Sequence, residues 1–201
     1  MNIAVFASGK GTNFSAIVRA IKKGKIKADL SLLVCDNPKA GVISRAKRAG
    51  IKVAKVLRED FSSKEDFEAG IIQHLEENKI DLIVLAGFMR LISAGFVKKY
   101  EGRILNIHPA LLPSFKGNEG IRDAFDYGVK VTGVTVHFVD TEMDHGPIIL
   151  QEAIKIEGDD TLASLEAKIH KLEHRIYPEA LRLCAEGKLK IEARKVKIIS
   201  T

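Results

Sequence analysis

Residues 2–23 read NIAVFASGKGTNFSAIVRAIKK and contain a strand, a loop and a helix in one short stretch. Asn2–Ala7 is a short, mostly apolar run that is typical of a buried strand. Ser8–Asn13 is rich in glycine and polar residues, and apolar residues return at helical spacing over Asn13–Lys23. This order indicates the first strand–helix unit of a parallel sheet.

The same alternation continues outward along the first half of the chain. It predicts strands over Leu30–Cys35, Val53–Val56, Asp81–Ala86 and Ile104–His108, and helices over Ala40–Ala49, Ser63–Asn78 and Ser93–Lys99. Period-two patterns then predict later strands, at least one antiparallel, over Val131–Val139 and Ile148–Ile156. A long helix is expected from Asp160 or Thr161 to Ala185, kinked at Pro178, and a basic edge strand over Lys188–Lys197. The fold class is therefore α/β, with a doubly wound, mostly parallel sheet.

The composition is that of an ordinary globular domain. Of 201 residues, 46% are hydrophobic and 29% are charged, which suits a single domain. The net charge of +6 comes from 32 basic and 26 acidic residues and fits an anionic substrate, although nucleic acid would fit too. Cys35 and Cys184 form no CxxC pair, and no apolar run reaches membrane-spanning length. We expect a cytoplasmic protein that contacts neither a membrane nor nucleic acid.

Three polar segments follow predicted strands. In the common strand order 3-2-1-4-5, the first and fourth strands are neighbours at the point where the order reverses, and ligands bind there beyond the carboxyl ends of the strands. Ser8–Asn13 follows the first strand, Gly87–Arg90 the fourth, and Asn106–Pro109 ends the fifth. We expect these segments to converge on one crevice.

The glycine-rich loop at Ser8–Asn13 has two interpretations. Backbone N–H groups at the helix start, with the Thr12 hydroxyl and the Asn13 amide, would bind an anion such as phosphate. The loop is not a P-loop, and Phe14 occupies the third glycine position of the dinucleotide fingerprint. The alternative is a glycine turn required only for tight packing between strand and helix.

Asn106 and His108 lie two apart on a predicted strand and would point to the same side. An amide and an imidazolium can both donate to a developing oxyanion, and histidine also transfers protons near neutral pH. Asp144, in the turn segment Asp144–Pro147, is a candidate partner. Alternatively, the histidine is structural and the aspartate caps loop amides.

One pattern suggests a metal. His170–His174 matches the H-x-x-E-H zinc motif, but no further ligand cluster follows it, so we expect no metal site. The chain also has no Ser or Cys nucleophile motif, which argues against covalent acyl transfer.

Five segments carry a resemblance to a known family: SGKGTN at 8–13, LAGFMRLIS at 85–93, LNIHPALLPSFKG at 105–117, VTGVTVHFVDTEMDHGPII at 131–149 and EHRIYP at 173–178. In order and spacing the chain resembles the phosphoribosylglycinamide formyltransferases, folate-dependent enzymes of purine biosynthesis. The resemblance implies a Rossmann-like formyltransferase fold in a single domain, 1–201. Residues 1–100 would form the nucleotide-binding half and 101–201 the folate-binding and catalytic half.

The resemblance also implies the reaction and its residues. A formyl group would pass from 10-formyltetrahydrofolate, as co-substrate, to the amine of glycinamide ribonucleotide, with Asn106, His108 and Asp144 as catalytic residues. Ribonucleotide contacts would come from Gly11, Thr12, Asn13, Gly87 and Glu173. Folate contacts would come from Lys64, Met89, Arg90, Leu91, Ile92, Val139 and Asp140. The small-molecule substrates would be the partners of a monomer or homodimer.

The chain departs from the family pattern at several positions. Lys10 and Thr12 replace a common Asn and Ser, 118–121 lacks a His-rich form, and His170 replaces a frequent Gln, which leaves its phosphate role open. Formyltetrahydrofolate hydrolases and methionyl-tRNA formyltransferases share the catalytic elements, but usually carry a regulatory or an RNA-binding domain that we do not expect here. A non-enzymatic nucleotide-binding module would need the glycine-rich loop alone.

Overall fold

The computed structural model describes residues 1–199. It divides the chain into two compact units, residues 1–105 and the residues from 106 onward. The strand β5 (Ile104–His108) carries the chain from the first unit into the second, and its predicted bounds are confirmed.

The first unit alternates strands and helices, as predicted. Its strands are β1 (Asn2–Phe6), β2 (Asp29–Cys35), β3 (Lys52–Lys55) and β4 (Leu82–Leu85), in the order β3-β2-β1-β4 with parallel pairing throughout. Its helices are α1 (Thr12–Lys22), α2 (Gly41–Ala49), α3 (Lys64–Glu77) and α4 (Ala94–Lys99). The predicted adjacency of the first and fourth strands is confirmed.

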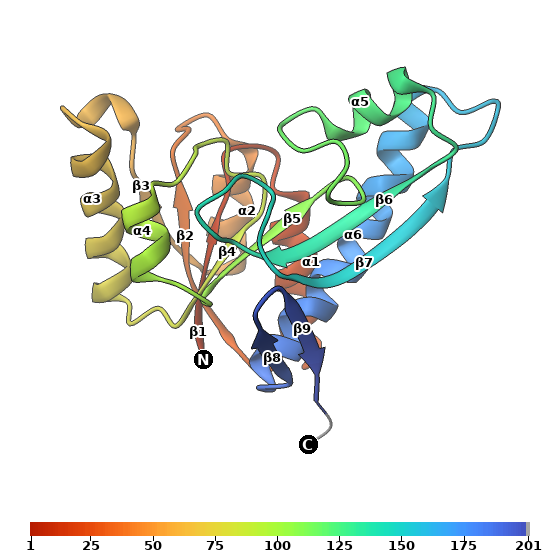
Figure 1. Ribbon diagram of the computed structural model, residues 1–201. Coiled ribbons are helices and arrows are strands. Elements are labelled where there is room, and N and C mark those ends of the chain that lie inside the picture. Colours follow the sequence, from red (N-terminus) through yellow and green to blue (C-terminus); the bar gives the residue numbers. More distant parts are fainter. Residues whose placement is uncertain (200–201) are drawn as a thin grey trace. The chain divides into compact units, whose positions relative to one another are not determined.

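Burial explains why these strands read as continuous apolar runs. Ile3–Phe6 and all of β4 are buried, because helices cover both faces of the sheet. Figure 1 shows α1 and α2 together on one face and α3 and α4 together on the other. Local signals set the helix starts: Ser63 and Ser93 each accept a backbone N–H three residues later.

The second unit contains the predicted antiparallel pair and the long helix. β6 (Val131–Phe138) pairs antiparallel with β7 (Ile148–Lys155), and α6 (Leu162–Ala185) packs against both strands. Thr161 and Ser164 form a reciprocal capping box at the start of α6. The fold is therefore α/β, with antiparallel C-terminal strands and a long C-terminal helix, as predicted.

Three features of the structure were not predicted. A short helix, α5 (Gly120–Tyr127), and a 3-10 turn, η1 (Arg58–Asp60), lie in stretches where no element was predicted, although Ile121, Ala124 and Phe125 have helical spacing. The C-terminal basic stretch is a hairpin of β8 (Leu189–Glu192) and β9 (Lys195–Ile198), whereas the sequence suggested one edge strand. Ala193, with a φ of +53°, makes the turn tight enough for Glu192 to pair with Lys195.

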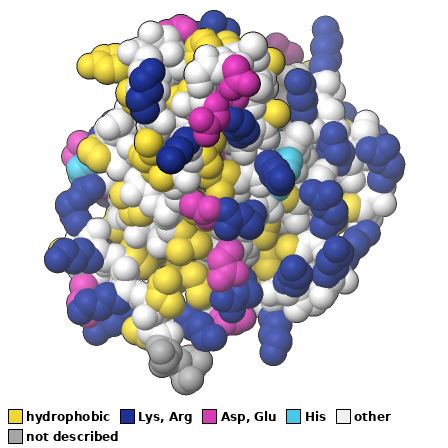
Figure 2. Space-filling view, turned by 90° about the vertical axis from the view of Figure 1, so that its right-hand side faces the viewer, with side chains coloured by type: hydrophobic (Ala, Val, Ile, Leu, Met, Phe, Trp, Pro, Cys, Tyr) yellow, Lys and Arg dark blue, Asp and Glu magenta, His cyan; other side chains and the backbone are white. Residues whose placement is uncertain are grey.

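The surface of the protein does not indicate which class of molecule it binds. No helix within residues 1–199 is long and apolar enough to cross a membrane. Cys35 is buried and Cys184 half-buried, and both thiols are free. Figure 2 shows Lys and Arg side chains spread over the visible face, with acidic and hydrophobic side chains between them.

Candidate active site

The glycine-rich loop of the first unit has the geometry of a helix start. Gly11 caps α1 with a φ of +74°, and a Cβ there would lie 2.5 Å from Val42 Cγ2. A glycine is therefore required both for the backbone conformation and for the approach of α2. Thr12 and Asn13 lie in the first turn of α1, and the dipole at a helix start favours an anion. The glycine is thus explained by packing, and the same loop is compatible with an anion at the helix start.

A buried hydrogen-bond network joins this loop to the segment after β4. Ser8 Oγ donates to Asp36 Oδ1 at 2.5 Å and accepts from the backbone N–H of Met89 at 3.0 Å. Arg90 Nε donates to Asp36 Oδ2 at 2.7 Å, and 46% of the Arg90 side chain remains exposed. The buried carboxylate thus fixes one end of the arginine while the rest of its side chain stays accessible.

A second buried carboxylate fixes the other end of that segment. Glu68, in α3, accepts from the backbone N–H of Ser93 at 2.7 Å and also from the Ser93 hydroxyl. Lys64 is the first residue of α3 and lies one helical turn before Glu68, on the same helix face. Gly87–Ser93, which includes four of the predicted folate contacts, is therefore held at both ends, while Met89 and Leu91 are 66% and 69% exposed.

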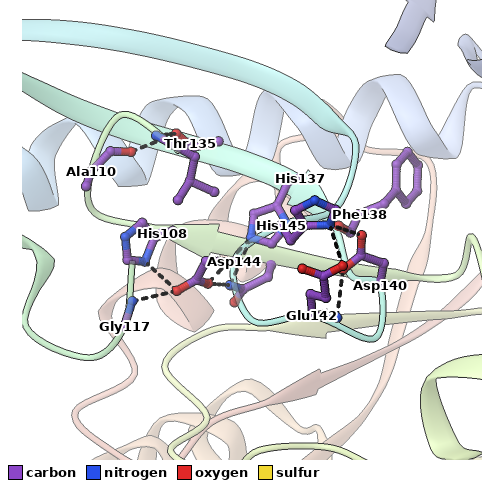
Figure 3. Close-up of polar contacts among 12 residues, drawn as sticks. His108, Ala110, Gly117, Thr135, His137, Phe138, Asp140, Glu142, Asp144 and His145 are labelled. Atoms are coloured by element: carbon purple, nitrogen blue, oxygen red, sulfur yellow. Dashed lines mark hydrogen bonds and ion pairs between the residues drawn. The ribbon is translucent and has the colours of Figure 1, made fainter. Parts of the chain in front are cut away.

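In the second unit, His108 and Asp144 lie together (Figure 3), and Asn106 contacts the same carboxylate. Asp144 Oδ2 lies 3.5 Å from His108 Nδ1, and Asp144 Oδ1 accepts from Asn106 Nδ2 at 3.4 Å. His108 Nε2 lies 2.7 Å from the Phe115 carbonyl oxygen, which can only accept. Because acceptors flank both ring nitrogens, the doubly protonated imidazolium satisfies both contacts.

His137 completes this cluster. Its Nδ1 donates to the Phe138 carbonyl at 2.8 Å, so in the neutral ring Nε2 carries the lone pair. Burial lowers the pKa of His137, which favours this neutral form. Asn106 Nδ2 lies 3.2 Å from His137 Nε2 and donates to it. His137 and Asp144 together therefore orient the amide of Asn106.

Asp144 is held in an unusual backbone conformation. Its φ is +48°, in the left-handed region that costs energy for residues other than glycine. The backbone N–H of Gly117 donates to Asp144 Oδ2 at 2.9 Å. Both carboxylate oxygens are thus occupied by donors, one from Asn106 and one from Gly117.

Buried polar side chains also fix the segment that follows β5. Thr135 Oγ1 donates to the Ala110 carbonyl at 2.7 Å and accepts from the Leu112 N–H at 3.1 Å. Gln151 Nε2 donates to the Leu112 carbonyl at 2.8 Å and to Thr135 Oγ1 at 2.9 Å. These contacts anchor the chain between His108 and Phe115, which supplies the carbonyl at the His108 ring.

Two other predicted site residues lie elsewhere in the second unit. Asp140 lies in the loop between β6 and β7, directly after Val139, and accepts from His145 Nδ1 at 2.7 Å. Glu173 is buried in α6 and accepts from His170 Nδ1 at 2.9 Å. Among residues 1–199, no group of three or more His, Cys, Asp or Glu residues is placed to hold a metal ion.

Sequence reasoning missed His137, Thr135, Gln151, Asp36 and Glu68. One signal was available for the first two, because Thr135 and His137 lie two apart on β6 and share a face. Asp36 and Glu68 carry no such signal: an aspartate in a turn and a glutamate in a helix are ordinary, and only their burial distinguishes them.

Comparison with known proteins identifies the family of the chain. Residues 1–181 match the family model described as formyl transferase. A phosphoribosylglycinamide formyltransferase from Bacillus subtilis (strain 168) is 49% identical over 89% of this chain and 92% of its own length. The crystal structure of glycinamide ribonucleotide transformylase 1 from Symbiobacterium toebii superposes with a TM-score of 0.97 at 43% identity, covering 100% of this chain and 94% of that one.

A longer relative matches as well. The trifunctional purine biosynthetic protein adenosine-3 of Homo sapiens is 40% identical over 94% of this chain, which spans 19% of that protein. The family model matches residues 1–181, and the bacterial relatives are similar to this chain over nearly the whole length of both proteins. These two findings decide the family. This chain belongs to the formyl transferase family.

Proposed function

We propose that this chain transfers a formyl group from 10-formyltetrahydrofolate to the amino group of glycinamide ribonucleotide, a step of purine biosynthesis. The observation that carries the proposal is the meeting of Asn106, His108 and Asp144 in a chain of the formyl transferase family. The names of the bacterial relatives support the choice of acceptor.

The reaction needs a polarised carbonyl and a route for one proton. The amine nitrogen attacks the formyl carbon, a C–N bond forms, and the carbonyl oxygen becomes an oxyanion. Asn106 Nδ2 donates to that oxygen in exchange for its long contact with Asp144 Oδ1, and the His108 imidazolium donates in exchange for its contact with the Phe115 carbonyl. The tetrahedral intermediate then expels the folate N10, which takes up the proton lost by the amine. The products are the formylated amine and tetrahydrofolate, and the enzyme is unchanged.

Asp144 has two roles in this scheme. It stabilises the cationic His108 ring, and it relays the amine proton, through water, towards the leaving nitrogen. The chemistry requires no metal, because the amine is itself the nucleophile and N–H donors polarise the formyl group. His108 and Asn106 take the part that a Lewis acid plays in other acyl transfers.

The substrates are assigned to separate segments. Gly11, Thr12 and Asn13 bind the ribose phosphate at the start of α1, Gly87 contacts the nucleotide, and Glu173 contacts the ribose hydroxyls. Folate contacts come from the anchored segment after β4, through Met89, Arg90, Leu91 and Ile92, from Lys64, and from Val139 and Asp140. We propose small-molecule substrates only, and a monomer or homodimer.

A steady-state assay tests the proposal. Purified protein is given 10-formyltetrahydrofolate with and without glycinamide ribonucleotide, and both formylated ribonucleotide and tetrahydrofolate are measured. Equal amounts of the two products, formed only when the ribonucleotide is present, are expected. Tetrahydrofolate release without an acceptor would instead indicate a hydrolase, and absence of turnover would indicate a binding module.

A further inference from the structure

The loop that carries Asp144, residues 139–146, is closed at its base. The backbone N–H of Phe138 donates to the Pro147 carbonyl at 2.9 Å, which joins the two strands at the loop ends. Gly146 packs so tightly that a Cβ there would lie 1.8 Å from the Phe138 carbonyl oxygen. The base is therefore fixed by β6 and β7, whereas Thr141, Glu142 and Met143 at the tip are exposed.

His145 lies within this loop beside Asp140 and Glu142 (Figure 3), and it also contacts Arg194, far away in the sequence. Its Nδ1 donates to Asp140 Oδ2 at 2.7 Å across the loop, with Glu142 Oε1 further away at 3.9 Å. Arg194 Nη1 lies 2.7 Å from His145 Nε2 and 3.2 Å from Nδ1, and Arg194 Nη2 donates to the His145 carbonyl at 2.8 Å. Because Nη1 is close to both ring nitrogens, it does not lie along one ring lone pair, and the directed hydrogen bond is the one from Nη2 to the His145 carbonyl.

Backbone pairing places Arg194 beside the loop. Arg194 lies in the turn between β8 and β9, and the next residue, Lys195, pairs with Ile148 at the start of β7. The hairpin therefore joins the sheet at the point where the loop ends. The family match ends at residue 181, so this hairpin lies outside the pattern that defines the family.

We propose that Arg194 is a positioning residue, which restrains the Asp144 loop so that Asp144 meets His108 and Asn106. Holding the His145 carbonyl fixes the backbone directly after Asp144, and the contact of Gly117 with Asp144 Oδ2 fixes its side chain. Such restraint matters because the contacts of Asp144 with His108 and Asn106 are long, at 3.5 and 3.4 Å, so a small shift of the loop would break them. This role in catalysis rests on the proposed formyl transfer.

The Arg194 contact is expected to act locally. It is exposed, and exposed polar contacts contribute little to global stability. Loops with few buried contacts open independently of the fold, so loss of one restraint increases local opening without unfolding the domain. The effect should therefore appear in loop motion and kcat, and not in the melting temperature.

Three variants of the full chain test this. Arg194→Met removes the contacts with both the ring and the carbonyl of His145. Arg194→Lys keeps the positive charge but has only one nitrogen to place against His145. Lys197→Met is the matched control, because Lys197 lies in the same hairpin and pairs with Glu192 inside it at 2.5 Å. The measurements are hydrogen exchange of the amides of residues 140–146, melting temperature, and kcat with both KM values.

Arg194→Met is expected to speed exchange in the loop and to lower kcat by roughly two- to fivefold, with an intermediate effect for Arg194→Lys and none for Lys197→Met. Unchanged loop exchange in Arg194→Met, or equal effects of Arg194→Met and Lys197→Met, would overturn the positioning role. Absence of formyl transfer by the wild type would refute the proposed function alone, because exchange reports the restraint without any turnover.

Discussion

Asn106 Nδ2 lies 3.2 Å from Nε2 of His137, a buried ring whose other nitrogen donates to the Phe138 carbonyl. The neutral ring thus presents a lone pair to the amide and determines which way the amide points. A histidine that makes no proposed contact with substrate thereby sets the direction of a proposed oxyanion donor.

Replacing His137 by leucine should misdirect that donor. The amide of Asn106 would keep only its longer contact with Asp144 and would be held less firmly in the orientation that presents N–H to the oxyanion. We expect kcat to fall about tenfold, less than for outright loss of an oxyanion donor, which costs about 10²–10³. Steady-state kinetics check this, and an unchanged kcat in a folded variant would contradict it.

The same residue predicts a pH dependence of stability. Burial lowers the pKa of His137 below its ordinary value of 6.5, so in acid the unfolded ring takes up a proton before the native ring does. The free energy of unfolding should therefore decrease as the pH falls through that ordinary value, until the native pKa is reached. Urea unfolding at several pH values should show that the free energy of unfolding of the wild type, relative to that of His137→Leu, decreases in acid. If the difference in unfolding free energy between the two proteins is the same at every pH, His137 does not contribute to the pH dependence of stability.

Asp144→Asn should be more damaging than its small size change suggests. Both oxygens of Asp144 accept hydrogen bonds, from Asn106 and Gly117, so an asparagine places its NH₂ against a donor in either orientation. It also removes the negative charge beside His108. We expect kcat to fall by about 10² or more. Measuring His108 nitrogen shifts by NMR should show loss of the doubly protonated ring, and wild-type shifts with wild-type kcat would reduce Asp144 to a loop cap.

Asp36→Asn should affect folate and spare the nucleotide. It weakens the charged hydrogen bond that fixes Arg90, so the exposed segment after β4 loses its anchor. We expect the folate KM to rise about tenfold with little change in the ribonucleotide KM. Asp29→Asn, at the opposite end of the same strand and exposed, is the control. Equal increases in both KM values would point to general disruption of the unit.

Glu173→Ala should have the opposite selectivity. Glu173 is buried in α6 and is assigned to the ribose hydroxyls, so its loss should raise the ribonucleotide KM by about tenfold, as expected for a lost hydrogen bond to a charged group. The folate KM should change little. Equal effects on both substrates would instead show that the carboxylate supports the helix, through contacts such as that with His170.

Local patterns in the sequence determined the elements and their order. The bounds of β5 were predicted to the residue, and those of β1, β4 and α6 to within one or two residues. Such bounds can be predicted because caps and glycines depend on the local backbone conformation, and apolar periodicity shows which face of an element is buried. The pairing of Asn106 with His108 on one side of β5 followed from the same regularity.

Tertiary structure alone decided which polar groups support these residues. Nothing local distinguishes Asp36 or Arg194 from ordinary polar residues, and the only local signal at His137 is that it shares a strand face with Thr135. Each of the three acquires its role from a partner far away in the sequence. The positive φ of Asp144 and the C-terminal hairpin were likewise decided by the tertiary structure. Contacts between distant residues depend on how the elements pack, whereas periodicity records only which face of each element is buried.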